Sequence, residues 1–306
     1  MRPKVQGSRH KVQDTRFKTC LRLAPCSLPL GFTLIELVIV MVVVGILGGI
    51  VAVFIQHPLQ AYLAATRRAA LVDAADTALA RIARDVHAAL PNSLRVVGAS
   101  GAVGSCSGAE ACYLEYLPIQ GGGRYRAEQT GTGTGDLLDF TQADTSFDVL
   151  GPAVAAIAGQ SVVVYNLGLP GADAWAGNNT SQVDVLHSSG CTGSGSACTL
   201  AIGSFKFPFE SPNKRFYLVG SPVSYACDPA ARALRRIGGY PLQPTQPNAS
   251  FPGATSNLLA DHVLTCTFTY ASGVTQNLGQ LTVRLQLSQD GETVTLYREV
   301  AVNNDA

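Results

Sequence analysis

The sequence predicts an α+β protein in which one long N-terminal helix precedes a large β-rich region. A nearly uncharged apolar run over residues 32–55 is followed by apolar residues at helical spacing. Beyond residue 92, short β-prone runs alternate with glycine-rich loops. We therefore expect the second half of the helix to pack on an antiparallel β-sheet, within an enlarged, loop-rich β domain.

The apolar run from Phe32 to Ile55 contains 24 residues and a single formal charge, Glu36. As a helix it would be about 36 Å long, enough to cross the ~30 Å hydrocarbon core of a bilayer. We therefore predict that residues 32–58 form a transmembrane half of the helix. Pro58 removes a backbone donor, which predicts a kink or local unwinding where the chain leaves the membrane.

Glu36 needs an explanation, because an acidic side chain in an apolar run costs about 2 to 4 kcal/mol unless it lies near the interface or has a partner. One explanation is helix capping. Residues 33–36 read Thr-Leu-Ile-Glu and fit the Thr-x-x-Glu capping box, and the helix dipole favours a carboxylate in the first turn.

Residues 59–91 are predicted to form the amphipathic half of the helix. Its apolar residues step by three or four positions and make one stripe, formed by Leu71, Ala75, Leu79, Ile82, Val86 and Leu90. On the other faces, Arg81 and Asp85 are four residues apart and can pair weakly. Those charges are interpreted as a solvated face or as subunit contacts, and residues 91–93 (Pro-Asn-Ser) are predicted to end the helix.

Residues 92–306 are predicted to form a β-rich domain. The expected strands are Tyr113–Leu117, Ser161–Leu167, Gln182–Leu186, Leu200–Phe207, Arg215–Tyr225, Val263–Tyr270, Gln280–Ser288 and Thr293–Val302. Residues 289–292 (Gln-Asp-Gly-Glu) predict a tight hairpin between the last two. Leucine and valine alternate with polar residues over 281–288, so one face of that strand should be buried.

Six cysteines lie beyond the apolar run, which suggests disulfides. Their spacing suggests two local bridges and one long bridge, one choice among 15 connectivities: Cys106 with Cys112, Cys191 with Cys198, and Cys227 with Cys266. A zinc site would need closer cysteine pairs with histidines nearby.

Residues 31–37 (Gly-Phe-Thr-Leu-Ile-Glu-Leu) resemble the processing site of type IV pilins and of the pseudopilins of type II secretion. In that family a prepilin peptidase cuts after the glycine and methylates the new N-terminal residue. The resemblance implies a pilin-like fold, removal of a leader formed by residues 1–31, cleavage between Gly31 and Phe32, and N-methylation of Phe32. It also implies that Glu36 pairs with the free amine of Phe32 in a neighbouring subunit.

The charge distribution agrees with the orientation of such a protein. Residues 1–31 carry seven basic residues and one acidic residue, whereas the rest of the chain carries 15 basic and 20 acidic residues. The positive-inside rule then predicts a cytoplasmic N-terminus, a single span of the bacterial inner membrane, and a periplasmic C-terminal domain in which disulfides can form. The acidic body does not favour nucleic-acid binding.

A weaker resemblance covers most of residues 31–306. It is to the larger minor pilins of the MshO type, which act in biogenesis of the mannose-sensitive haemagglutinin pilus, and more distantly to the J-type minor pseudopilins. Among the segments that carry it are residues 90–93, 114–118, 164–168 and 266–270. It implies a minor subunit in biogenesis or tip assembly of a pilus or pseudopilus. The implied partners are prepilin peptidase, other major and minor subunits, the inner-membrane assembly platform and the lipid bilayer.

Three alternatives remain open: a major pilin, a tip adhesin, and a membrane-anchored periplasmic hydrolase. A major pilin is less favoured because repeated packing favours a smaller head. For the hydrolase, the sequence offers no acid, base and nucleophile set, and we expect no enzyme activity, cofactor or metal. Four aspartates raise the question of calcium, but they lack EF-hand spacing and are interpreted as polar loop residues: Asp136, Asp139, Asp144 and Asp148.

Overall fold

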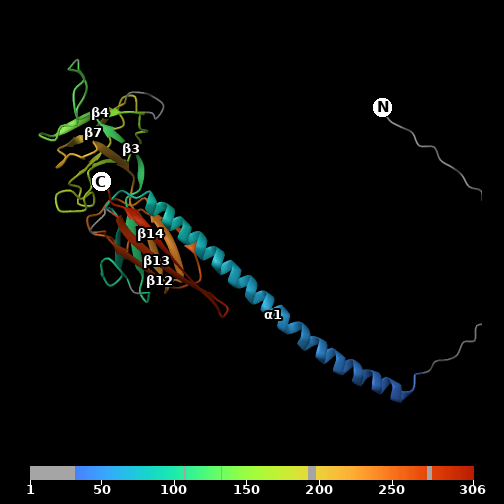
Figure 1. Cartoon of the computed structure of the whole chain (residues 1–306). Coiled ribbons are helices and arrows are strands. Elements are labelled where there is room, and N and C mark those ends of the chain that lie inside the picture. The colour runs from blue at the N-terminus through green and yellow to red at the C-terminus, as the bar shows by residue number, and fades with distance from the viewer. Residues whose placement is uncertain (1–31, 107, 132, 192–197, 274–277) are drawn as a thin grey trace, which may run out of the picture. The chain divides into compact units, whose positions relative to one another are not determined.

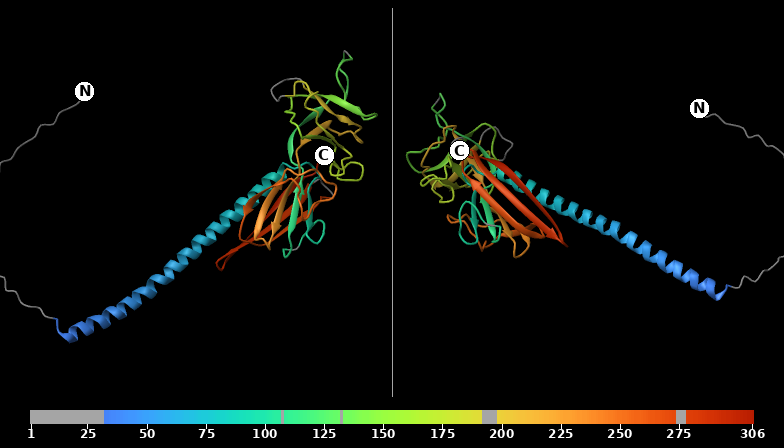
Figure 2. Two further views of the ribbon diagram at one scale, coloured as in Figure 1. Left: turned by 180° about the vertical axis from the view of Figure 1, so that it is seen from behind. Right: turned by 60° about the horizontal axis from the view of Figure 1, so that its bottom comes forward.

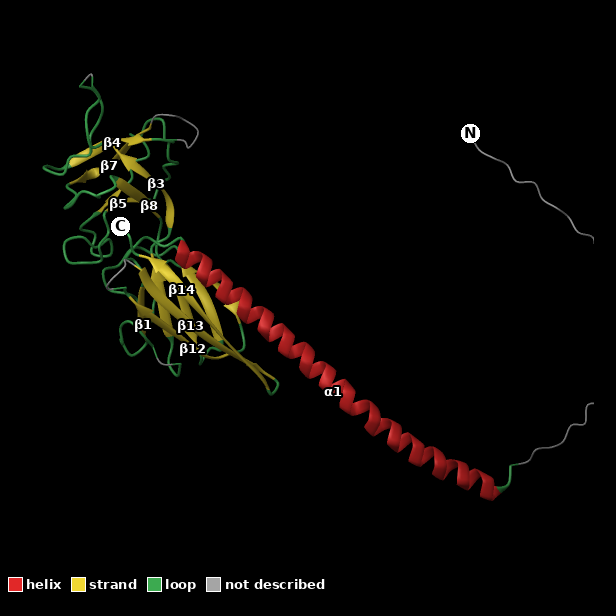
Figure 3. Ribbon diagram, viewed as in Figure 1, coloured by secondary structure: helices red, strands yellow, loops and turns green. Residues whose placement is uncertain are grey.

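The computed structural model describes residues 32–106, 108–131, 133–191, 198–273 and 278–306 (Figure 1). Within these residues it contains one helix and fourteen antiparallel strands, which confirms the α+β class (Figure 3). The chain divides after Leu59 into two compact units. The predicted leader, including Gly31, lies outside the described residues.

Helix α1 (Leu34–His87) contains 54 residues and includes Pro58. The predicted kink at Pro58 stays a prediction. The helix ends at His87, before the predicted stop at residues 91–93, but Leu90 is still buried and its N–H donates to the Leu117 carbonyl at 2.8 Å. The predicted stripe is confirmed, because the residues of α1 that are buried are Leu71, Ala75, Ala78, Leu79, Ile82 and Val86.

The strands form three sheets. The five-stranded sheet has the order β1-β2-β9-β10-β11 and contains β1 (Arg95–Gly98), β2 (Cys112–Tyr116), β9 (Val223–Asp228), β10 (Ala233–Gly238) and β11 (Thr255–Ala260). The three-stranded sheet contains β12 (Val263–Ala271), β13 (Leu278–Gln289) and β14 (Glu292–Asn303). The six-stranded sheet contains β3 (Ile119–Tyr125), β4 (Asp144–Leu150), β5 (Ser161–Val164), β6 (Thr180–Gln182), β7 (Cys198–Phe205) and β8 (Arg215–Val219).

The first two sheets share one hydrophobic core with the stripe of α1. In both views of Figure 2, the three-stranded sheet runs beside the C-terminal half of the helix. Its core face carries the alternating residues of β13, Leu281, Val283, Leu285 and Leu287, which are all buried as predicted. Packing of apolar side chains from both sheets therefore holds this half of the helix in place.

The six-stranded sheet closes on itself into a small barrel. Its order is β6-β5-β8-β3-β4-β7, and an isolated bridge joins Val183, just after β6, to Ile202 of β7. Large side chains such as Tyr125, Phe147 and Phe216 fill the interior. The barrel is an insertion between β2 and β9, which are neighbours in the five-stranded sheet.

The predicted hairpin is confirmed. Gln289 pairs with Glu292, so the loop contains only Asp290 and Gly291, and both have positive φ as a type I′ turn requires. Two strand predictions need correction. The expected strand Arg215–Tyr225 is two strands, β8 and β9, in different sheets, because the chain crosses from the barrel to the five-stranded sheet at residues 220–222. The strand expected at 182–186 ends at Gln182.

Candidate functional site

The N-terminal turn of α1 is capped by Thr33. Its Oγ1 accepts a hydrogen bond from the backbone N–H of Glu36 at 3.3 Å, and its carbonyl accepts from Leu37 N–H at 3.2 Å. Thr33 is thus the N-cap, and Glu36 is the third helical residue, where the dipole favours a carboxylate. No ion pair involves Glu36 among the described residues, so its charge has no partner within this part of the chain.

The first half of α1 exposes its apolar side chains on all sides. Every residue from Phe32 to Tyr62 is exposed, including Phe32 and Phe54 at 75% and 79%. Exposure of such a surface to water is unfavourable, because removing apolar surface from water is favourable by about 25 cal/mol per Å². In the described residues α1 is the one helix long and apolar enough to cross a membrane.

Glycines mark one face of this exposed segment. A Cβ atom added at Gly45, Gly48 or Gly49 would meet no other atom within 4 Å. Gly45 and Gly49 are four residues apart, so they lie on the same side of the helix and let another helix approach closely.

The other end of α1 is held by a partly buried polar cluster around Asp85. Asp85 Oδ2 accepts hydrogen bonds from the Tyr225 hydroxyl at 2.8 Å, Arg236 Nε at 2.9 Å and the Tyr116 hydroxyl at 3.0 Å. Asp85 Oδ1 accepts from Arg81 Nε at 3.0 Å, which confirms the predicted pair. One carboxylate of the helix therefore binds side chains from β2, β9 and β10.

This cluster shifts the pKa values of its members. Burial by itself would raise the pKa of Asp85, but the hydrogen bonds from Tyr225, Arg236 and Tyr116 outweigh it, so the pKa of Asp85 is lowered from its ordinary value of 3.8. Burial and the adjacent carboxylate raise the pKa values of Tyr225 and Tyr116, so both hydroxyls remain donors at neutral pH. Asp85 is therefore ionised and fully paired.

A second buried network lies at the junction between the barrel and the rest of the β domain. Glu115, which is fully buried, accepts from Arg95 Nε and from the Tyr240 hydroxyl, both at 2.6 Å. The Arg95 guanidinium lies 3.6 Å from the ring centre of Trp175, which belongs to the barrel insertion and donates its indole N–H to the Ser93 carbonyl at 2.9 Å. These contacts join the inserted barrel to the strand that follows the helix.

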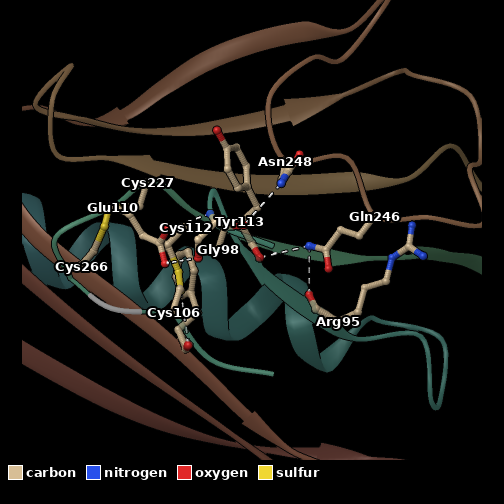
Figure 4. The surroundings of a disulfide bond; sticks show 12 residues. Arg95, Gly98, Cys106, Glu110, Cys112, Tyr113, Cys227, Gln246, Asn248 and Cys266 are labelled. Carbon is tan, nitrogen blue, oxygen red and sulfur yellow. Dashed lines mark hydrogen bonds between the residues drawn. A yellow bond between two sulfur atoms is a disulfide. The ribbon is translucent and has the colours of Figure 1, made fainter. Parts of the chain in front are cut away.

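The six cysteines form the three disulfides that their spacing suggested: Cys106–Cys112, Cys191–Cys198 and Cys227–Cys266. Cys112 and Cys227 are direct neighbours on β2 and β9, so two of the bridges extend from adjacent positions (Figure 4). Cys227–Cys266 links the five-stranded and three-stranded sheets. Nearby, Gln246 Nε2 donates to the Tyr113 carbonyl at 3.1 Å and holds the loop after β10 against β2.

The four aspartates weighed for calcium are occupied by protein partners. Asp148 pairs with Arg126 at 3.1 Å and accepts from the Thr199 hydroxyl at 2.7 Å, and Asp136 accepts from Ser146 at 2.6 Å. Asp144 and Asp148 lie in strand β4 and not in a loop, which corrects their interpretation as loop residues. In the part of the chain that the structure describes, no three His, Cys, Asp or Glu side chains could hold a metal ion.

Sequence reasoning missed the two buried carboxylates. Asp85 was interpreted as part of a solvated face or of subunit contacts, and Glu115 was given no role. Their partners lie between 20 and 151 residues away along the chain, apart from Arg81, so local spacing contained no signal for them.

Comparisons with family models, with curated proteins and with solved structures found no match for this chain.

Proposed function

We propose that this chain is a minor pilin or pseudopilin, a structural subunit in the biogenesis or tip assembly of a type IV pilus or a related type II secretion filament. The single observation that carries the proposal is the position of Glu36. It lies in the first turn of an exposed apolar helix and has no ion pair among the described residues. Residues 31–36, which run into the first turn of that helix, form the Gly-Phe-Thr-Leu-Ile-Glu string that resembles a prepilin processing site.

In this proposal, cleavage between Gly31 and Phe32 frees an amine at the head of the helix. The amine would lie four residues, about one helical turn, before Glu36 of its own chain, and it would pair with Glu36 of a neighbouring subunit. Neutralising a charge in an apolar environment removes a penalty of several kcal/mol, which favours assembly in one axial register. The exposed apolar half of α1 would lie in the inner membrane before assembly and against other subunits afterwards.

The C-terminal half of α1 supports this role, because it is fixed to the β domain by the buried stripe and by Asp85. The β domain would lie in the periplasm, where its three disulfides can form. The inserted barrel favours a minor subunit, since a head enlarged in this way fits repeated packing poorly and is tolerated at a tip. Prepilin peptidase, other subunits and the assembly platform would be its partners.

Intact mass and N-terminal sequencing of the purified chain test the proposal. The full chain is expressed with and without prepilin peptidase in otherwise identical cells. We expect a mature chain that begins with N-methylated Phe32 when the peptidase is present, and the uncleaved chain when it is absent. A Gly31→Glu variant should stay uncleaved in both. A chain that begins at any other residue in the presence of the peptidase contradicts the proposal.

A further inference from the structure

The three-stranded sheet ends in a long, unpaired edge. Strand β14 contains 12 residues, pairs with β13 along its whole length without a register shift, and has no second partner strand among the described residues. The corresponding edge of the five-stranded sheet, β11, has six residues and an irregularity in its pairing with β10. Bulges and short lengths protect edges from further pairing, and β14 has neither.

The register identifies which backbone groups of β14 are free. In a two-residue hairpin the residues that flank the loop bond each other, so Glu292 and every second residue after it direct N–H and C=O groups toward β13. The alternate residues direct theirs away from the sheet: Thr293, Thr295, Tyr297, Glu299, Ala301 and Asn303. Their side chains are all exposed, Tyr297 by 72%. In the described chain, no backbone hydrogen bond reaches these outer groups.

An open groove of about 800 Å³ lies beside the N-terminal part of this strand. Helix α1 lines one side with four alanines and Val72, together with the charged Arg68, Asp73 and Asp76, and among the described residues β14 lines the other side with Glu292 and Leu296; the alanines are Ala61, Ala64, Ala65 and Ala69. Alanine side chains leave room for a further backbone at strand spacing. The groove therefore offers space, an apolar wall and unpaired backbone groups along the same strand.

The charges beside β14 favour a partner with a basic side chain. Arg68 pairs with Glu292 at 2.7 Å, and Arg298 pairs with Asp76 at 3.6 Å. Two acidic side chains have no ion pair among the described residues: Asp73 in the groove and Glu299 on the outer face of β14. A basic partner residue would neutralise either of them.

We propose that β14 is a docking edge for an extended segment of another polypeptide, which adds a strand to this sheet. That segment would have apolar residues at alternate positions, facing the alanines of α1, and at least one Lys or Arg. This inference goes beyond the filament role, because it depends only on the fold from Gln60 onward.

A labelled peptide with the sequence of β13, residues 278–289, is a suitable probe, since β13 already pairs with β14 on its inner edge and Arg284 is its only charge. Binding to the full chain in detergent is measured by fluorescence anisotropy. We expect saturable binding, a loss of at least about tenfold in Thr295→Pro, and a several-fold loss in Glu299→Lys, because Arg284 alternates with the apolar residues of the peptide and so lies on the same outer face as Glu299. Proline removes an outer N–H without touching the bonds to β13. Glu128→Lys, an exposed charge change in the barrel insertion, is the matched control and should bind normally.

Hydrogen exchange provides a second readout that does not depend on a variant folding. In the free chain the outer amides of Thr295, Tyr297 and Glu299 should exchange faster than their inner neighbours, and the peptide should slow them. Equal protection of outer and inner amides without peptide, absence of saturable binding, or equal binding by Thr295→Pro would overturn the proposal. So would self-association of the full chain that Thr295→Pro abolishes, because the occupant would then be a second copy.

Discussion

Asp85 Oδ2 and Arg236 Nε lie 2.9 Å apart, and this contact joins the last turn of α1 to strand β10. The Asp85 side chain is only 12% exposed and also accepts from two tyrosine hydroxyls. A buried carboxylate with several donors fixes the rotation of the helix as well as its position, because any turn of the helix would leave the donors unpaired. The apolar stripe alone would tolerate a rotation of the helix better, because apolar contacts are less directional than hydrogen bonds.

We predict that Asp85→Ala lowers the free energy of unfolding by about 2 to 4 kcal/mol, because it leaves Arg236, Tyr116 and Tyr225 without their shared acceptor. Urea denaturation followed by far-UV circular dichroism measures the change. Asp73→Ala is the control, an exposed aspartate on the same helix, and should change the free energy of unfolding by less than about 0.5 kcal/mol. Equal effects of the two substitutions would contradict the role of Asp85.

The lowered pKa of Asp85 predicts how the free energy of unfolding falls at acidic pH. Because its pKa is lower in the folded chain than its ordinary value of 3.8, the unfolded chain takes up this proton first as the pH falls. The stabilisation from Asp85 is therefore complete at neutral pH and is lost below about pH 4. We expect the difference in free energy of unfolding between the wild type and Asp85→Asn to be constant from about pH 5 to 7 and to narrow toward pH 3. A difference that widens toward pH 3 would show that folding does not lower the pKa of Asp85.

The stripe and the hairpin could be predicted from the sequence because each depends on local periodicity. Leu71, Leu79 and Ile82 recur at helical spacing, and Asp290-Gly291 supplies the two positive φ values of a tight turn. Both signals lie within a few residues of the structure that they determine.

Strand β3 and the Asp85 cluster could not be found in this way. Residues 121–123 of β3 are three glycines, which are typical of loops, yet a Cβ at Gly122 would lie 2.8 Å from the Phe216 carbonyl. Glycine is needed there because β8 approaches so closely. The partners of Asp85 come from strands that meet only after folding, so no spacing in the helix could reveal them.

The three disulfides should differ in their contribution to stability. Cys227–Cys266 closes a separation of 39 residues and Cys191–Cys198 one of seven, so the chain-entropy model assigns about 4 and about 2 kcal/mol. All four cysteines are buried, and replacing each pair with alanine removes similar side-chain volume. We predict a loss of stability larger by about 1 to 2 kcal/mol for the Cys227/Cys266 pair, measured by urea denaturation. Equal losses would contradict the entropic account.

The buried pair of Arg95 and Glu115 should show the asymmetry of a desolvated ion pair. Arg95→Met leaves Glu115 buried with only the Tyr240 hydroxyl, and we expect a loss of about 3 kcal/mol. Adding Glu115→Gln removes the unpaired charge while keeping an acceptor for Tyr240, so the double variant should be more stable than Arg95→Met. The fluorescence of Trp175, the single tryptophan, reports the unfolding. A double variant less stable than the single one would contradict this reasoning.

Glu36 allows the capping and assembly explanations to be separated. Glutamine also satisfies a capping box, so Glu36→Gln should behave like the wild type if Glu36 only caps the helix. If its charge pairs with the amine of a neighbour, both Glu36→Gln and Glu36→Ala should enter filaments poorly. Removing one partner of a buried ion pair costs about 3 to 5 kcal/mol. Sheared filament and membrane fractions are compared by immunoblot, and thermal unfolding of the β domain should be unchanged in both variants. Normal incorporation of Glu36→Gln would reject charge pairing as the basis of assembly.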